Sequence, residues 1–305
     1  MIKYEWILTI FAFILATSIG PAKTSTDRMS IEQKFSELSE LNWKQEFFDS
    51  CTEDWRKQWF LDGERAIVRN SPQGMLFSAG PVETDHASHA VIWTKKSFVG
   101  DVKIEFDYTR MDTINRNVNI LYIQATGIGK EPYDKDIAKW SYLRAIPYMK
   151  SYFQNMNLLH ISFAAYDRDD PKRDYVRARR YPVKPDLKFD EIDIPPDNFD
   201  TGLFEPGIVH HFTVIKKGHD LYMKVAPLPS SLPLRLPPRL LGEDKSGRAA
   251  GEENKGARLF YWDTSRFQPV TEGRIGLRHM WTRCSRYKNV RISTLALTQD
   301  NGGRI

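Results

Sequence analysis

The sequence predicts an all-β fold, a two-sheet antiparallel jelly-roll sandwich with one helical excursion. Its 305 residues are 41% hydrophobic and 27% charged, which is enough apolar material for a full core. Short segments in which polar and apolar residues alternate follow one another between turns, as in an antiparallel sandwich. Because sandwiches often reach this size as one unit, we expect a single domain from residue 51 to residue 298.

Residues 1–22 have the layout of a secretory signal peptide. One early lysine precedes an apolar run from Trp6 to about Ala16, and small residues follow at Ser18 and Gly20. The run is shorter than the ~20 residues that a membrane span needs. We therefore expect an exported protein, periplasmic or extracellular, with no stable membrane insertion.

The rest of the chain divides into a lead-in, a series of strands and a tail. A polar lead-in occupies residues 23–50, of which 25–39 looks helical or loose, and residues 299–305 form the tail. A helix is expected at 133–153, and residues 226–257, rich in Pro and then in Gly and charge, predict a long surface loop. Alternation and turn signals predict twelve strands, at 65–69, 75–78, 87–94, 102–109, 117–126, 158–166, 175–182, 210–216, 221–225, 259–263, 274–280 and 288–294.

The two cysteines lie near opposite ends of the predicted domain, at Cys51 and Cys284. In an oxidising compartment they could form one bridge that closes a long loop, or they could remain two separate thiols. The sequence leaves both alternatives open. We expect the N- and C-terminal strands of the domain to be neighbours.

Alternation along the strands also gathers polar side chains on one face. His160 lies opposite the apolar face of Leu159 and Ile161, although it could also be a hydrogen-bonded core histidine. Arg278 and His279 point to opposite faces of their strand, so at most one of them joins a common site. The other residues that we assign to a concave ligand groove are His89, Trp93, Tyr166, Arg177, Arg179 and Tyr181.

Three other motifs are weaker. Glu191 and Asp193 resemble an acidic glycoside hydrolase motif, but the proline pair at 195–196 should break a central strand there. Residues 127–130 lack the leading glycine and the Ser/Thr of a phosphate loop. The four aspartates within 167–174 lack the glycine and final glutamate of a calcium loop. We expect no cofactor and no metal ligands, with a structural calcium ion in that run as the open alternative.

Several segments of the sequence are similar to the bacterial domain-of-unknown-function family typified by YesU. The resemblance covers most of residues 55–293 and implies a concanavalin A-like jelly roll in a setting of polysaccharide utilisation. It carries no assigned reaction. The segments that carry it include His89-Ala-Val-Ile-Trp93, Met156-Asn-Leu-Leu-His160-Ile-Ser-Phe, Tyr175-Val-Arg-Ala-Arg179-Arg180-Tyr181 and Glu272-Gly-Arg-Ile-Gly-Leu-Arg278-His279-Met.

A site of His, Tyr and Arg without a carboxylate pair suits proton abstraction next to a uronate carboxyl group. We therefore predict a β-eliminating lyase or dehydratase that acts on anionic, uronate or sulfated, oligosaccharides. The net charge of +5 fits a surface that receives anions and is too small for a dedicated nucleic-acid binder. The predicted roles are His160 as base with His279 as second candidate, Tyr166 or Tyr181 as proton donor, and Arg177 and Arg179 as groups that hold a carboxylate or sulfate. Arg278 is predicted as a further substrate-binding residue, and His89 and Trp93 as groove lining.

Two alternatives from other classes stay open. The same aromatic and arginine side chains would serve a noncatalytic carbohydrate-binding protein, which transfers no proton. A glycoside hydrolase would instead use carboxylates, for which the candidates are Asp107, Glu105 and Asp263.

Overall fold

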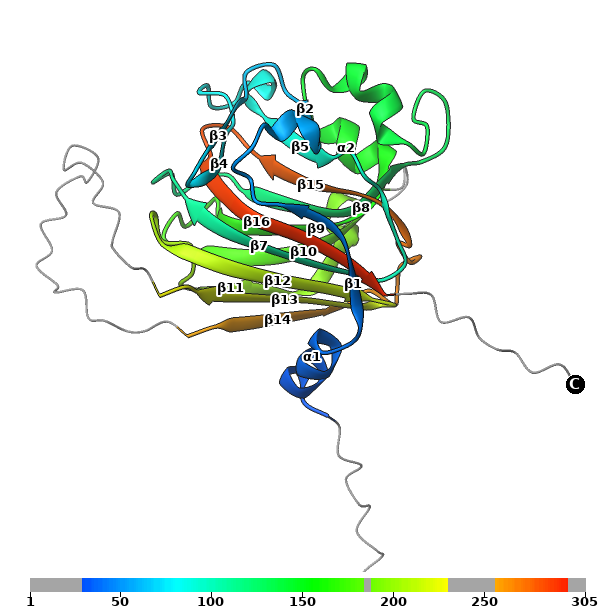
Figure 1. Ribbon diagram of the computed structural model, residues 1–305. Coiled ribbons are helices and arrows are strands. Elements are labelled where there is room, and N and C mark those ends of the chain that lie inside the picture. Colours follow the sequence, from blue (N-terminus) through cyan, green and yellow to red (C-terminus); the bar gives the residue numbers. More distant parts are fainter. Residues whose placement is uncertain (1–28, 184–187, 230–255, 296–305) are drawn as a thin grey trace, which may run out of the picture.

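The computed structural model describes residues 29–183, 188–229 and 256–295, which form two antiparallel sheets packed face to face (Figure 1). Each sheet has eight strands within these residues, and the predicted all-β sandwich is confirmed. Sheet A contains β1 (Trp43–Asp49), β3 (Ile67–Ser71), β4 (Gly74–Ser78), β7 (Val102–Arg110), β12 (Val209–Lys217), β13 (Asp220–Pro227), β14 (Arg258–Asp263) and β16 (Cys284–Leu295). Sheet B contains β2 (Trp59–Asp62), β5 (Ala90–Thr94), β6 (Phe98–Val99), β8 (Asn119–Gly127), β9 (Met156–Tyr166), β10 (Asp174–Tyr181), β11 (Asp193–Phe199) and β15 (Glu272–His279).

The twelve predicted strands are all present, and β1, β2, β6 and β11 are additional. β1 lies within the segment predicted as a lead-in, after helix α1 (Ile31–Ser39), so the sandwich begins before residue 51. It runs antiparallel to β16, and the first and last strands are therefore neighbours, as Figure 1 shows in blue and red. β11 contains Pro195 and Pro196 because it is an edge strand that pairs only with β10, and an edge strand tolerates proline.

Alternating side chains fill the space between the sheets. On β9, Leu159, Ile161 and Phe163 point into the inter-sheet core, whereas His160 and Ser162 lie on the outer face of sheet B. The core residues pack against those of sheet A, such as Phe212, whose ring lies 5.0 Å from that of Phe163. The polar side chains of β9 therefore lie on the outer face of sheet B.

A helical insertion between β8 and β9 covers part of that outer face. It consists of the 3-10 segment η3 (Ile137–Arg144) and helix α2 (Met149–Asn155), where one helix was predicted at 133–153, and it lies at the top of Figure 1 in green. Trp140 and Tyr152 of the insertion pack with Trp93 and Tyr122 of the sheet in a second hydrophobic cluster. The insertion therefore adds a third layer at one end of sheet B.

Cys51 and Cys284 are free thiols. In the antiparallel β1–β16 pairing Asp49 lies opposite Val290, so the same register carried on to Cys51 leads to Lys288, four residues from Cys284. At about 3.3 Å per residue this offset places the two cysteines roughly 13 Å apart along the strand. A disulfide needs Cα atoms within ~7 Å, so the structure excludes a bridge between them.

Three sequence predictions fall on residues outside the described ranges: the signal peptide at 1–22, the tail at 299–305, and most of the long loop at 226–257. β13 and β14 flank that loop, and β13 extends to Pro227. Among the described residues, no helix is long and apolar enough to cross a membrane.

Candidate functional site

The outer face of sheet B brings together most of the polar residues predicted for the site. Strand register places Arg179 beside His160, and it places Arg177 beside Ser162 on the same face. Two strands further across the sheet, Arg278 pairs with Ile120, which in turn pairs with Ser162. Tyr181 reaches the same cluster from the end of β10 through its hydroxyl group.

His160 is the centre of this cluster and is almost fully buried, with 1% of its surface exposed. Its Nδ1 lies 2.8 Å from the Tyr181 hydroxyl oxygen, and its Nε2 lies 2.7 Å from Ser162 Oγ. Burial, and then the positive charges of Arg179 and nearby arginines, hold the His160 pKa well below its ordinary value. The imidazole is therefore neutral and can accept a proton, but both ring nitrogens are engaged and the ring is covered.

Two ion pairs lie at the open side of the cluster, between β10 and β11. Arg177 Nε donates to Asp197 Oδ2 at 2.7 Å, and Arg179 Nε donates to Asp193 Oδ1. The four side chains are between 13% and 28% exposed, so the pairs are held firmly and still face solvent. Sequence analysis missed both carboxylates as partners. The sequence feature that could have predicted these partners is the match in charge between two arginines two residues apart and the acidic residues of the following segment.

Tyr166 does not join the cluster, contrary to the prediction. Opposite the two-residue step from Tyr175 to Arg177, β9 takes three residues from Ala165 to Ser162, and Ala164 has a positive φ of 44°. This β-bulge reverses the alternation beyond it. The Tyr166 hydroxyl group instead accepts a hydrogen bond from Arg110 of sheet A.

His279, the second base candidate, lies in the inter-sheet core. Its ring stacks on Phe77 with the centroids 4.4 Å apart, and its Nε2 lies 2.9 Å from the Tyr287 hydroxyl oxygen of sheet A. Burial lowers the His279 pKa to about 3. It cannot replace His160 as a base on the outer face, because it occupies the other side of the sheet.

Trp93 faces outward as predicted, but the insertion covers it completely. Its ring stacks with those of Tyr122 and Tyr152 at 5.3 and 6.4 Å, and its Nε1 donates to Asp62 Oδ2 at 2.7 Å. Trp93 was predicted to line a ligand groove, but in this structure its side chain is fully covered by protein.

His89 is also fully buried, beside a cluster of aromatic rings that reaches the surface. Its ring lies 4.5 Å from that of Trp281 and 5.6 Å from that of His86, which in turn is 4.3 Å from the ring of Tyr148. Tyr148 is 41% exposed. Sequence analysis did not assign His86, Tyr148 or Trp281 to the site, because they come from turns and from the insertion.

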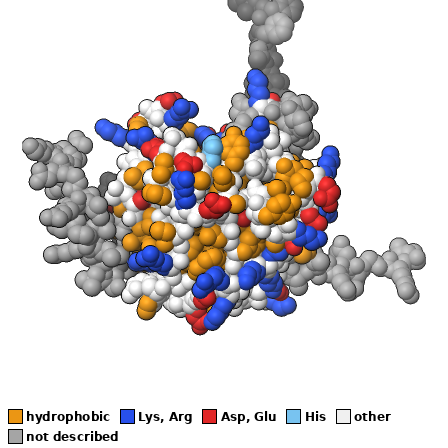
Figure 2. Space-filling view, turned by 90° about the horizontal axis from the view of Figure 1, so that it is seen from above, with side chains coloured by type: hydrophobic (Ala, Val, Ile, Leu, Met, Phe, Trp, Pro, Cys, Tyr) orange, Lys and Arg blue, Asp and Glu red, His pale blue; other side chains and the backbone are white. Residues whose placement is uncertain are grey.

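Part of the exposed surface of the insertion, within residues 142–148, is apolar. Figure 2, seen from above, shows hydrophobic side chains gathered on this end of the molecule. They include Tyr142, Leu143 and Ile146, which are 69%, 40% and 51% exposed.

The carboxylates considered for a hydrolase lie elsewhere. Glu105 and Asp107 are on the outer face of sheet A, where Asp107 Oδ1 lies 2.8 Å from His211 Nδ1. Asp263 ends β14 at the edge of the same sheet. None of the three shares the outer face of sheet B with His160, so these three carboxylates do not form a groove with the His160 cluster.

No group of three or more His, Cys, Asp or Glu side chains among the described residues is arranged to hold a metal ion. In the aspartate-rich run, Asp167 and Asp170 accept hydrogen bonds from the backbone N–H groups of Asp169 and Lys172. Asp174 bonds to Thr201 instead. A calcium ion in this run stays an untested alternative.

No protein-family model matches the sequence, and no curated protein does. Among solved structures, a Bacillus subtilis protein of unknown function with a galectin-like fold aligns with a TM-score of 0.55 and 14% identity, over 82% of this chain and 96% of its own. Lectin II from Ulex europaeus aligns over 82% and 98% with a TM-score of 0.46 and 10% identity. A carbohydrate-binding module from Bacillus subtilis aligns over 78% and 96% with a TM-score of 0.40 and 11% identity. The first similarity shows that the chain has a galectin-like jelly-roll fold.

Proposed function

We propose that this protein binds carbohydrate, without transforming it, through the outer face of sheet B. The observation that carries the proposal is the pair of partly exposed ion pairs, Arg177–Asp197 and Arg179–Asp193. Neighbouring hydroxyl groups of a sugar can donate to these carboxylates and accept from these guanidinium groups. Because each ion pair already holds its side chains in place, little conformational entropy is lost on binding.

Three further points support the proposal. The galectin-like fold shared with the Bacillus subtilis protein favours it by analogy of fold. The resemblance to YesU-like domains is consistent with a setting of polysaccharide utilisation, and the N-terminal pattern is typical of an exported protein. Within this function we favour acidic sugars, because the guanidinium group of Arg278 on this face is buried and forms no ion pair within the described residues.

A second candidate is the predicted β-elimination, which one contact favours. The 2.8 Å contact between His160 Nδ1 and the Tyr181 hydroxyl group joins a neutral base to a proton donor, whose pKa burial raises well above 10. A substrate would have to displace the cover of His160 before either group could touch it. Binding without catalysis needs no such displacement, and it is therefore the main proposal.

The test is calorimetric titration with a panel of neutral and acidic oligosaccharides. Asp197→Asn, which breaks an ion pair on sheet B, is expected to weaken binding by about tenfold or more. The matched control is Asp107→Asn, which alters the Asp107–His211 pair on the opposite sheet and should leave affinity unchanged. Equal affinities of both variants and the wild type would refute the proposed face.

The same panel separates binding from elimination. The ultraviolet absorbance of an unsaturated uronate should stay absent in the wild type. Its appearance, and its loss in His160→Ala, would establish elimination and overturn the noncatalytic proposal.

A further inference from the structure

Arg278 on β15 is a fully buried cation that lacks most of its hydrogen bonds. Its Nη2 donates to the Pro147 carbonyl oxygen at 2.7 Å, and its guanidinium carbon lies 4.5 Å from the centre of the Tyr152 ring. Its Nε and Nη1 are buried and make no hydrogen bond of normal geometry among the described residues, although the Tyr122 hydroxyl group lies close enough to Arg278 to interact with it. These two nitrogen atoms, which carry three N–H groups, are therefore largely unsatisfied in the interior.

Neighbouring arginines do not share this property. Carboxylates neutralise Arg144, Arg177 and Arg179, each through an ion pair within the described residues. Arg180 also lacks a carboxylate, but its nitrogens donate to three neutral acceptors, the carbonyl oxygens of Gln268 and Leu158 and Oδ1 of Asn157. Within the described residues, Arg278 alone of these five has neither a carboxylate partner nor acceptors for most of its N–H groups. A buried cation of this kind is costly unless an anion compensates it.

A second unsatisfied polar atom lies nearby on the same face. His89 Nδ1 is buried without a partner among the described residues, while its Nε2 lies 3.5 Å from His86 Nδ1. Burial, and then the charge of Arg278, lowers the His89 pKa to about 2, so the ring is neutral. In the tautomer with hydrogen on Nδ1, His89 offers a third donor beside the two of Arg278.

The cover over these groups is a short connection, residues 145–148, between η3 and α2. Glu64 N–H donates to the Ala145 carbonyl oxygen at 3.2 Å, and Arg278 donates to that of Pro147. Between these two points Ile146 is 51% exposed, and Tyr148, which follows them, is 41% exposed. An anion that bonds to Arg278 would take the place of the Pro147 carbonyl group, which requires the buried Pro147 to shift.

We propose that Arg278 and His89 form a subsite for the anionic group of an acidic sugar, which reaches them by displacing the Pro147 carbonyl group. The rings of His86, Trp281 and Tyr148 border this subsite and would contact the sugar ring. The inference rests on the proposed carbohydrate-binding function and specifies its ligand class. It also moves the anion-binding role away from Arg177 and Arg179, whose charges are already balanced.

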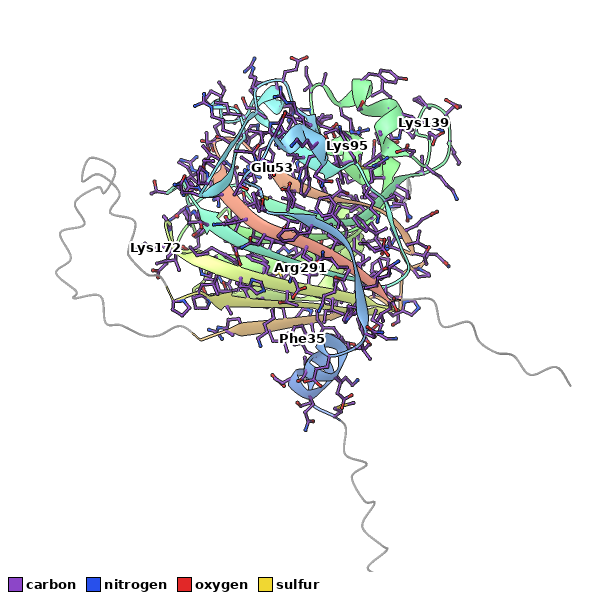
Figure 3. The ribbon with its side chains drawn as sticks, in the orientation of Figure 1. Phe35, Glu53, Lys95, Lys139, Lys172 and Arg291 are labelled. Atoms are coloured by element: carbon purple, nitrogen blue, oxygen red, sulfur yellow. The ribbon has the colours of Figure 1, made fainter. Side chains whose placement is uncertain are left out.

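The test compares trigalacturonate with its fully methyl-esterified form by calorimetry. The wild type is expected to bind the acid at least about tenfold more tightly, since hydrogen bonds to charged groups are the stronger ones. Arg278→Met should remove this preference. Arg291→Met is the matched control, because Arg291 is an exposed arginine on sheet A, seen on the front of the molecule in Figure 3, and its loss changes the net charge equally. The preference should persist in that variant.

A measurement of Tm in the presence of sulfate tests the anion site without any sugar. Sulfate should raise the Tm of the wild type and of Arg291→Met, but not that of Arg278→Met, because only a folded anion site gains from it. Equal binding of both sugars by the wild type, or a preference that survives in Arg278→Met, would overturn the subsite and leave carbohydrate binding intact. Binding of neither sugar would refute the proposed function for this ligand class, and the sulfate result would then decide on Arg278 alone.

Discussion

Asp62 fastens the helical insertion to sheet B, and its replacement should be among the most destabilising changes in the protein. One carboxylate oxygen, Oδ2, accepts from Arg144 Nε at 2.6 Å, from Trp93 Nε1 at 2.7 Å and from the Tyr152 hydroxyl group at 3.0 Å. Arg144 and Asp62 are both fully buried. The substitution Asp62→Asn keeps an acceptor for Trp93 and Tyr152 but leaves the Arg144 charge uncompensated.

The expected cost follows from that uncompensated charge. Breaking a buried ion pair by removing one partner destabilises a protein by about 3–5 kcal/mol, which corresponds to a Tm lower by about 6–20 °C for a domain of this size. The double variant Asp62→Asn with Arg144→Met should recover about 2 kcal/mol or more relative to the sum of the single variants, since it removes both charges.

Urea denaturation followed by tryptophan fluorescence measures these free energies of unfolding. The control is Glu53→Gln, which breaks the fully exposed Glu53–Lys57 pair near the top of Figure 3 and should change nothing measurable. If Asp62→Asn changed stability by less than about 1 kcal/mol, the ion pair would not hold the insertion, and the reasoning about its burial would be refuted.

Two further predictions concern pH and packing. Burial lowers the pKa of His89 to about 2 and that of His279 to about 3, whereas histidines of the unfolded chain titrate near ~6.5. The unfolded state thus gains protons first as the pH falls, so each of these histidines should reduce stability by about 1.4 kcal/mol per pH unit below ~6.5. Urea unfolding at pH values above and below ~6.5 measures this effect, and a stability that does not change with pH would contradict the prediction. Gly276→Ala should cost about 1–3 kcal/mol in the same assay, because its Cβ would lie 2.4 Å from ring atoms of the fully packed Trp93; an unchanged stability would show that the ring can move.

Local sequence patterns were sufficient to predict most strands of the sandwich, but they did not predict the edge strand β11. Alternation along β9 placed Leu159 and Ile161 in the core because a strand with one face on the core and the other on polar groups repeats every two residues. β11 has no such signal. It contains Pro195 and Pro196. Its place beside β10 is stabilised by ion pairs from Asp193 and Asp197, which the match in charge suggests but periodicity does not. Edge strands that depend on such long-range contacts are hidden from a reading of periodicity.

The candidate site shows the same division. Alternation correctly placed His160, Arg177 and Arg179 on one face, because their strands are regular there. Beyond Ser162 the bulge shifts the register by one residue, and one residue is enough to move Tyr166 to the other side of the sheet. A bulge of this kind leaves no clear trace in the alternation, since the residues around it are small or apolar on both faces.

The burial of Trp93 and Arg278 has a different origin and links the fold to the proposed subsite. Both side chains point outward, as their strands require, and they become buried only because the insertion folds back over sheet B. Asp62 holds one part of that insertion through Arg144, whereas Arg278 holds its 145–148 connection through a single carbonyl group. The first contact is an ion pair and the second is not, so the second is the one that an anionic ligand can replace without unfolding the insertion.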